Sequence, residues 1–215
     1  MCLIALSVEK SKDWNGKESY FFKIIANRDE YHERKTTAMH WWSNKEILAG
    51  KDEEAGGTWL GTNREGKFGA ITNLKENSAI KYDSSRGALV TDFLESNLSA
   101  KAYLEEIEPV MENYAGFNLI VGDKKGLFYL CNRLEGIFFI SEGVHALGNL
   151  TLNSSTKKVE AIKHDLNDIL HEGFSVEKGF NVMKKEYGNL HEKTKKELQV
   201  RDGEEIPYRF IRSPI

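Results

Sequence analysis

The sequence opens with Leu3-Ile4-Ala5-Leu6-Ser7-Val8, and a second β-rich run, Tyr20-Phe21-Phe22-Lys23-Ile24-Ile25-Ala26, follows it. Between the two runs, the pair Asn15-Gly16 favours a tight turn with positive φ. We therefore expect the chain to begin with an antiparallel β-hairpin. Four polar residues, Asn27-Arg28-Asp29-Glu30, come directly after the second run, so this hairpin would place them beside the N-terminus.

Further along the chain, groups of short strand patterns alternate with pairs of helical patterns. Strands are expected at residues 46–49, 58–62, 68–74, 117–121, 127–131, 137–140 and 208–211, and helices at residues 85–94, 101–111, 155–171 and 176–186, the last capped by Ser175. Ser99 is a plausible cap between the first two helices. This order predicts one α+β domain over residues 1–215 and argues against a Rossmann fold.

The composition is that of an ordinary globular protein. Of the 215 residues, 40% are hydrophobic and 29% are charged, which excludes disorder as a main feature. A net charge of −3 provides no general attraction for nucleic acid or anionic lipid. No segment approaches the roughly 18 apolar residues of a membrane span, and the opening residues lack the basic flank of a signal peptide, so we expect a cytoplasmic protein without stable membrane insertion.

The cysteines and histidines do not indicate a metal site. Cys2 and Cys131 are too few for a disulfide framework, and no Cys/His spacing resembles a zinc site. We therefore expect no metal and no cofactor.

Cys2 can be considered as an N-terminal nucleophile. Removal of Met1 would leave a thiol and an unblocked α-amine on one residue, so that nucleophile and base are joined. An α-amine titrates at about 7.7–8.0, close enough to neutrality to accept the thiol proton, whereas a lysine is normally charged. The alternative is that Cys2 is a small apolar residue beginning the first strand, and position alone favours that alternative.

Other polar elements fit the same chemistry. Arg28 and Asp29 could orient the N-terminus, or they could form a surface ion pair in a solvated turn. The paired glycines of Gly56-Gly57-Thr58-Trp59-Leu60-Gly61 allow a close backbone approach, and Trp59 in that stretch is expected in the core. Asn73, at a strand end, can donate its amide to an oxyanion.

Several stretches resemble the NRDE family, also known as the transport and Golgi organisation protein 2 family, in order and spacing. They are Met1-Cys2-Leu3-Ile4, Ala26-Asn27-Arg28-Asp29-Glu30-Tyr31, Glu46-Ile47-Leu48-Ala49-Gly50, Gly56-Gly57-Thr58-Trp59-Leu60-Gly61, Thr72-Asn73, Arg86-Gly87 and Gly116-Phe117-Asn118-Leu119-Ile120. The match is close over residues 1–150 and looser beyond them. On this combination of motifs the chain is identified as a member of the family.

The resemblance implies an N-terminal nucleophile (Ntn) hydrolase fold, in which two antiparallel sheets stack between helical layers, as in conjugated bile acid hydrolases and penicillin V acylases. It implies that Cys2 attacks an amide carbonyl and that Arg28 and Asp29 position it. It also implies that Asn73 and Asn149 help to stabilise the transition state.

The sequence departs from the family pattern near its end. The chain reads Leu147-Gly148-Asn149 where the family commonly has Leu-Ser-Asn, and it lacks both the Pro-Trp element that usually follows and the later Tyr-Gly-Thr-Arg segment. Together with the abrupt end at Ile215, this leads us to expect a fragment, or a fold without its C-terminal strands and without a C-terminal arginine in the site.

His32 and His40 lie close in sequence to the aromatic pair Trp41-Trp42. These four residues could form an apolar lip at the rim of the site, or the histidines could bind haem iron. The alternative, loop residues that pack against the domain, is the more common arrangement. Cys131, within an apolar strand, is expected to be buried.

Two functions remain open at this point. The first is an amidohydrolase that acts on a linear or lipid-like small-molecule amide through Cys2. The second is a non-catalytic carrier of haem or of a lipid or acyl ligand, because the resemblance connects family members with haem trafficking and with lipid or coenzyme A metabolism. The presence of Cys2 favours the enzyme, and the departures around Asn149 favour the carrier.

Overall fold

The computed structural model describes residues 2–12, 14–28, 30, 33–74, 82 and 84–184. Within them, a three-stranded sheet of order β10-β1-β2 is made by β1 (Leu3–Lys12), β2 (Glu18–Asn27) and β10 (Gly143–Leu147). β1 and β2 form the expected hairpin, with Leu3 opposite Asn27 and Lys12 opposite Glu18. Gly16 in the connecting turn has a φ of 76°, a conformation that glycine adopts without steric cost.

The second sheet has seven antiparallel strands in the order β3-β4-β5-β6-β7-β8-β9. They are β3 (Thr36–Trp41), β4 (Ile47–Asp52), β5 (Leu60–Asn63), β6 (Phe68–Asn73), β7 (Phe117–Asp123), β8 (Gly126–Cys131) and β9 (Phe138–Ile140). Each strand pairs with its neighbour in the sequence, since a short turn or a helical connection joins each pair.

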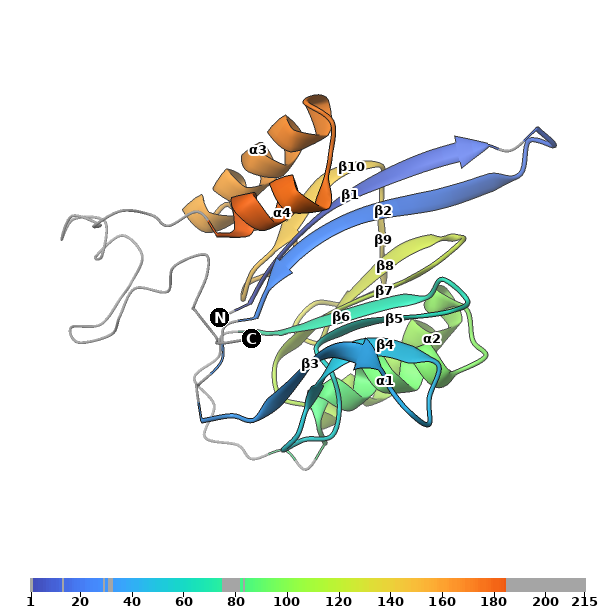
Figure 1. Cartoon of the computed structure of the whole chain (residues 1–215). Helices are drawn as coiled ribbons and strands as arrows, with labels where there is room; N and C mark the ends of the chain where they lie inside the picture. The colour runs from blue at the N-terminus through green and yellow to red at the C-terminus, as the bar shows by residue number, and fades with distance from the viewer. Residues whose placement is uncertain are drawn as a thin grey trace.

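The helices form two outer layers (Figure 1). α1 (Arg86–Glu95) and α2 (Ala100–Ile107), which continues as the 3₁₀ segment η1 (Glu108–Asn113), pack on the seven-stranded sheet. α3 (Lys157–His171) and α4 (Val176–Met183) pack on the three-stranded sheet. The expected caps are present, because the hydroxyls of Ser99 and Ser175 accept hydrogen bonds from the backbone N–H groups three residues ahead.

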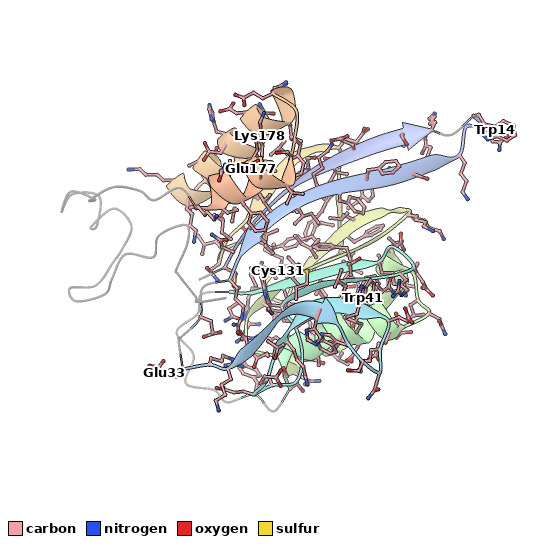
Figure 2. The ribbon with its side chains drawn as sticks, viewed as in Figure 1. Trp14, Glu33, Trp41, Cys131, Glu177 and Lys178 are labelled. Atoms are coloured by element: carbon pink, nitrogen blue, oxygen red, sulfur yellow. The ribbon has the colours of Figure 1, made fainter. Side chains whose placement is uncertain are left out.

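Burial explains why β1 begins with the apolar residues 3–6. Leu3 and Ala5 face the α3/α4 layer, whereas Ile4, Leu6 and Val8 face the other sheet, so both sides of the strand are covered. β8 shows the same division: Tyr129 and Cys131 lie between the sheets, and Leu130 faces α1 and α2. Figure 2 shows Cys131 in this position, with Trp14 at the distant tip of the first hairpin.

The four layers confirm the predicted α+β arrangement of two antiparallel sheets between helices. Two strands, β3 and β10, were not predicted. β3 has no buried residue, so its sequence carries no alternation of apolar and polar positions, and β10 has only five residues. The expected strand at residues 208–211 lies outside the described residues.

Candidate active site at the Cys2 end of the sheets

Cys2 immediately precedes β1, at the edge where β2 and β10 both end. Leu3 pairs with Asn27 and Ile4 with Leu147. Arg28 directly follows β2, and Asn149 comes two residues after the end of β10, both at this edge of the sheet. Cys2 is half-buried, and the N-terminal label in Figure 1 marks this end of the sheet.

Asn73 and Asn149 meet at the same end. Asn73 is the exposed last residue of β6. The side-chain Nδ2 of Asn149 donates a hydrogen bond of 2.8 Å to the main-chain oxygen of Asn73. This contact links the end of the seven-stranded sheet to the segment after β10. Two residues predicted from separate parts of the sequence are therefore neighbours.

Arg28 belongs to a cluster of charges beside this end. Its guanidinium lies 3.3 Å from a carboxylate oxygen of Glu30 and 3.2 Å from one of Asp52, and Arg34 Nε donates to the same Asp52 oxygen at 2.7 Å. Side-chain exposure is 19% for Arg28 and 16% for Asp52. The cluster therefore holds the Arg28 guanidinium in a defined place. Asp29, the predicted partner of Arg28, lies outside the described residues, as does His32.

The structure stabilises the charged form of the Asp52 carboxyl group. Burial alone would raise the pKa of its carboxyl group, but hydrogen bonds from Arg34 and from the backbone N–H groups of Ala55 and Glu54 outweigh burial and lower the pKa. The sequence analysis missed Asp52, because the chain separates it from Arg28 by 24 positions and no local pattern marks it. Only the turn at the end of β4 brings it to Arg28.

Three of the sequence motifs converge close to Asn73. The Arg86 guanidinium at the start of α1 donates to the Gly116 carbonyl at 3.0 Å, and the Leu74 amide donates to the same oxygen at 2.9 Å. Asn118, two residues further along, is fully buried between the sheets. The motif that contains Asn118 contributed to the family resemblance, but the sequence did not indicate the hydrogen-bond partners of Asn118.

The aromatic pair Trp41-Trp42 lies at the opposite end of the seven-stranded sheet. Across the sheet, Trp41 pairs with Leu48, Leu48 with Thr62, and Thr62 with Phe68. Phe68 is the first residue of β6, five residues before Asn73 at the other end of that strand. The alternative in which Trp41 and Trp42 form a lip at the rim of the Cys2 site does not fit this register. Their part in ligand binding, like that of His40 beside them, remains a prediction.

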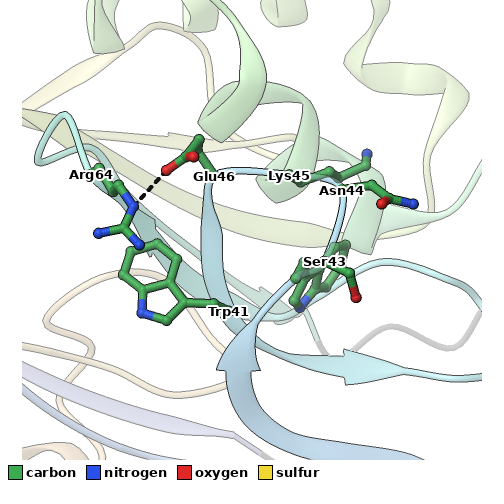
Figure 3. Close-up of a pocket in the computed structure, with 7 residues that line it drawn as sticks. Trp41, Ser43, Asn44, Lys45, Glu46 and Arg64 are labelled. Carbon is green, nitrogen blue, oxygen red and sulfur yellow. Dashed lines mark ion pairs between the residues drawn. The ribbon is translucent and has the colours of Figure 1, made fainter.

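A pocket of about 330 Å³ does lie at this opposite end (Figure 3). It is lined by Trp41, Trp42, Ser43, Asn44, Lys45, Glu46 and Arg64. Arg64 Nε lies 2.6 Å from Glu46, and the guanidinium carbon lies 4.1 Å from the centre of the Trp41 ring. Lys45 forms an ion pair with Glu95 on α1, which does not line the pocket. Trp42 donates its indole N–H to the Ala49 carbonyl and packs on the core. The charged side chains of this pocket are thus engaged in ion pairs, and Trp42 is engaged in core packing.

Both Trp59 and Cys131 were expected to be buried, and the structure confirms this fully for Cys131 and partly for Trp59. Cys131 is fully buried. Trp59 is only partly buried and contacts the cores on both faces of the seven-stranded sheet.

Among the described helices, none combines the length and apolar character needed to cross a membrane.

Comparison with solved structures identifies the fold. The Caenorhabditis elegans ortholog of N-acylethanolamine-hydrolyzing acid amidase superposes with a TM-score of 0.58 over 86% of this chain and 86% of its own, at 11% sequence identity. The layered arrangement is thus the Ntn-hydrolase fold, as the resemblance implied.

Sequence comparison identifies relatives. The Transport and Golgi organization 2 homolog of Mus musculus is 37% identical over 153 residues, and the Homo sapiens homolog is 35% identical over the same length. Each alignment covers 66% of this chain and 55% of the relative, so the chain spans just over half the length of the curated relatives it matches. The family model described as Transport and Golgi organisation 2 matches residues 1–213. This chain belongs to the Transport and Golgi organisation 2 family.

Proposed function

We propose that this protein is an N-terminal-cysteine hydrolase that acts on a linear or lipid-like amide. The observation that supports the proposal is that β1 begins directly after Cys2, next to the end of β2 at Asn27 and the end of β10 at Leu147. A nucleophile with a cationic group and an amide donor at the same sheet edge has the groups that acyl transfer requires. The Ntn-hydrolase fold supports the same class of reaction.

The proposed reaction begins once Met1 is removed. The α-amine of Cys2 takes the thiol proton, and the sulfur attacks the amide carbonyl carbon, which turns the carbonyl oxygen into an oxyanion. The C–N bond then breaks, the leaving amine takes the proton from the α-ammonium, and an acyl thioester remains on Cys2. Water loses a proton to the same α-amine, attacks the thioester, and releases the carboxylic acid together with the thiol.

Asn149 and Asn73 are the proposed oxyanion donors. An amide nitrogen carries two N–H donors, and Asn149 directs one of them to the Asn73 carbonyl, so the second can be directed to substrate. The exposed side chain of Asn73 supplies another donor. Loss of one such donor costs about 100- to 1,000-fold in kcat in other acyl-transfer enzymes.

Arg28 has a positioning role in this proposal. Glu30 and Asp52 hold its guanidinium directly after the end of β2, and in this proposal its positive charge favours the thiolate of Cys2 over the thiol. Asp29 is included on the family resemblance as a second orienting group.

The choice of substrate follows the structural neighbour, whose name records the hydrolysis of N-acylethanolamines. The first substrates to test are therefore fatty acyl amides, followed by N-acyl amino acids and penicillin-like lactams. In each of these the scissile bond is an amide to which the same reaction applies.

The test compares wild type with Cys2→Ala on this panel, with Cys131→Ala as the matched control. Both variants lack one thiol, but Cys131 is fully buried whereas Cys2 is half-buried. We expect weak hydrolysis by wild type, retention in Cys131→Ala and complete loss in Cys2→Ala. Equal activity in Cys2→Ala and wild type would exclude a thioester on Cys2.

The carrier function is tested with haem as the probe on the same proteins. Removing one sulfur atom should scarcely change the affinity of a pocket for an apolar ligand. Tight haem binding without hydrolysis by wild type, abolished in His32→Ala, His40→Ala or Trp42→Ala, would favour the carrier over the hydrolase.

A further inference from the structure

The segment Gly148–Leu152, which carries Asn149, is held on both sides of that residue by side chains of the other sheet. Thr72 on β6 donates its hydroxyl to the Gly148 carbonyl at 2.9 Å. Asn118 on β7 donates Nδ2 to the Leu150 carbonyl at 3.0 Å. The Leu152 amide donates to the Tyr129 hydroxyl on β8 at 3.3 Å. Three neighbouring strands thus each contact one backbone group of the segment.

The three side chains are also bonded to one another. The Tyr129 hydroxyl donates to Asn118 Oδ1 at 2.7 Å, and Asn118 Nδ2 donates to Thr72 Oγ1 at 3.2 Å. Their exposed fractions are 3% for Tyr129, 0% for Asn118 and 1% for Thr72. We call Thr72, Asn118 and Tyr129 the inter-sheet clamp.

The surroundings of the inter-sheet clamp are apolar. Tyr129 packs in the cluster between the sheets that also contains Ile120 and Cys131. Burial and the neighbouring Cys131 raise the pKa of Tyr129, so its hydroxyl keeps the proton that it donates to Asn118. Because a buried polar group without a partner is costly, the segment has few alternative positions that satisfy all three side chains.

The hydrogen bonds of the inter-sheet clamp lie next to Asn149. Thr72 and Asn73 are adjacent on β6, and they bond to the adjacent residues Gly148 and Asn149. The clamp therefore sets the position of the Asn149 amide relative to β6, although Asn149 follows a strand of the other sheet. Hydrophobic contact between the sheets alone would leave this relative position less defined.

We propose that Thr72, Asn118 and Tyr129 are positioning residues that hold Asn149 in place for the oxyanion, an inference that rests on the proposed function. None of the three touches the reacting atoms in this proposal. They act through Asn149 alone, so that the seven-stranded sheet determines the geometry of a site whose nucleophile lies on the three-stranded sheet.

A double-mutant cycle tests this proposal. We expect Tyr129→Phe to lower kcat about tenfold with little change in KM, because small displacements of a catalytic group reduce rate more than binding. In the Asn149→Ala background the same change should have no further effect. Additive losses in the double variant would overturn the proposal.

Tyr103→Phe is the matched control. Tyr103 is also buried, and its hydroxyl donates to the Leu89 carbonyl at 2.8 Å, but it lies on α2 in the outer helical layer. Both substitutions remove one buried hydroxyl, so both should lower the free energy of unfolding. Only Tyr129→Phe should lower kcat, and equal losses of kcat in the two variants would show a general effect of destabilisation.

Hydrogen exchange separates this proposal from the proposed function. In Tyr129→Phe, but not in Tyr103→Phe, the Leu152 amide should exchange at least tenfold faster while amides in the middle of β1 keep their protection. A wild type without turnover on any amide would refute the hydrolase, yet the exchange measurement would still test the clamp. Unchanged exchange at Leu152 in Tyr129→Phe would overturn the clamp whatever the activity.

Discussion

The backbone of Gly57 lies directly against the backbone of Gly87. A β carbon built on Gly57 would lie 2.7 Å from the Gly87 carbonyl carbon and 2.8 Å from its oxygen. Gly57 lies just before β5 and Gly87 is the second residue of α1, so two motifs 30 positions apart pack together here. The close approach anticipated from the paired glycines is found at Gly57, whereas a β carbon on Gly56 would meet no atom within 4 Å.

Gly57→Ala should destabilise the protein by about 1–3 kcal/mol, because the atoms that the new methyl group meets are backbone and cannot move aside independently. Urea denaturation measures the change in the free energy of unfolding. Gly148→Ala is the control, since a β carbon there meets only a Val159 methyl at an ordinary 3.7 Å. Equal stabilities of the two variants would contradict this packing argument.

The intact mass of the purified protein shows whether Met1 has been removed. Protein made in a host with normal methionine removal should begin at Cys2. Iodoacetamide should then label Cys2 in the native protein and Cys131 only after denaturation, because Cys131 is fully buried and Cys2 is half-buried. Peptide mass spectrometry measures both sites, and retention of Met1 would be incompatible with the proposed catalytic role.

Asp52→Asn should cost about 1–3 kcal/mol at pH 7, because Arg28 and Arg34 both lose a charged partner. The folded pKa of Asp52 lies below its ordinary 3.8, so its contribution is present above pH 3.8 and is lost as the pH falls through the lower folded value. The variant should therefore lose less stability than wild type on acidification below pH 4.

The control for Asp52→Asn is Glu54→Gln. Glu54 lies 3.8 Å from Arg34 and its side chain is 56% exposed, so the change should stay within about 0.5 kcal/mol. Denaturation at pH 7 distinguishes the two variants. A loss as large in Glu54→Gln as in Asp52→Asn would mean that Asp52 does not hold the cluster.

His145 on β10 should titrate below its ordinary value. Burial lowers its pKa and the nearby Lys163 adds to this effect, although the bond to the Ser141 carbonyl opposes both. Neutral His145 donates Nε2–H to Ser141 and accepts at Nδ1 from the amide of Asn153, which has a φ of 58°. Protonation would remove that acceptor and weaken the turn after Asn149.

The pH dependence of stability follows from the sign of this shift. Because the unfolded chain takes up the proton first, the free energy of unfolding should fall as the pH drops below 6.5. NMR titration of His145 against a peptide of residues 141–149 measures the shift. A midpoint in the protein at or above that of the peptide would contradict it.

Local sequence patterns determined much of the frame. The Asn15-Gly16 turn fixed the first hairpin, and the hydroxyls of Ser99 and Ser175 marked two helix starts, because each of these signals acts over a few residues. The motifs around Cys2 and Asn73 likewise indicated which sheet edge carries the candidate site. Strand β3 gave no such signal, since none of its side chains is buried.

By itself, then, the sequence determined the family, the α+β order of elements and the candidate residues Cys2, Arg28, Asn73 and Asn149. Only the tertiary structure decided their partners: Asp52 beside Arg28, Tyr129 and Asn118 behind Asn149, and the separation of Trp41 from Cys2. The reason is physical. Hairpins and caps depend on neighbours in the chain, whereas these contacts depend on how two sheets stack, and that depends on packing between residues far apart in the sequence.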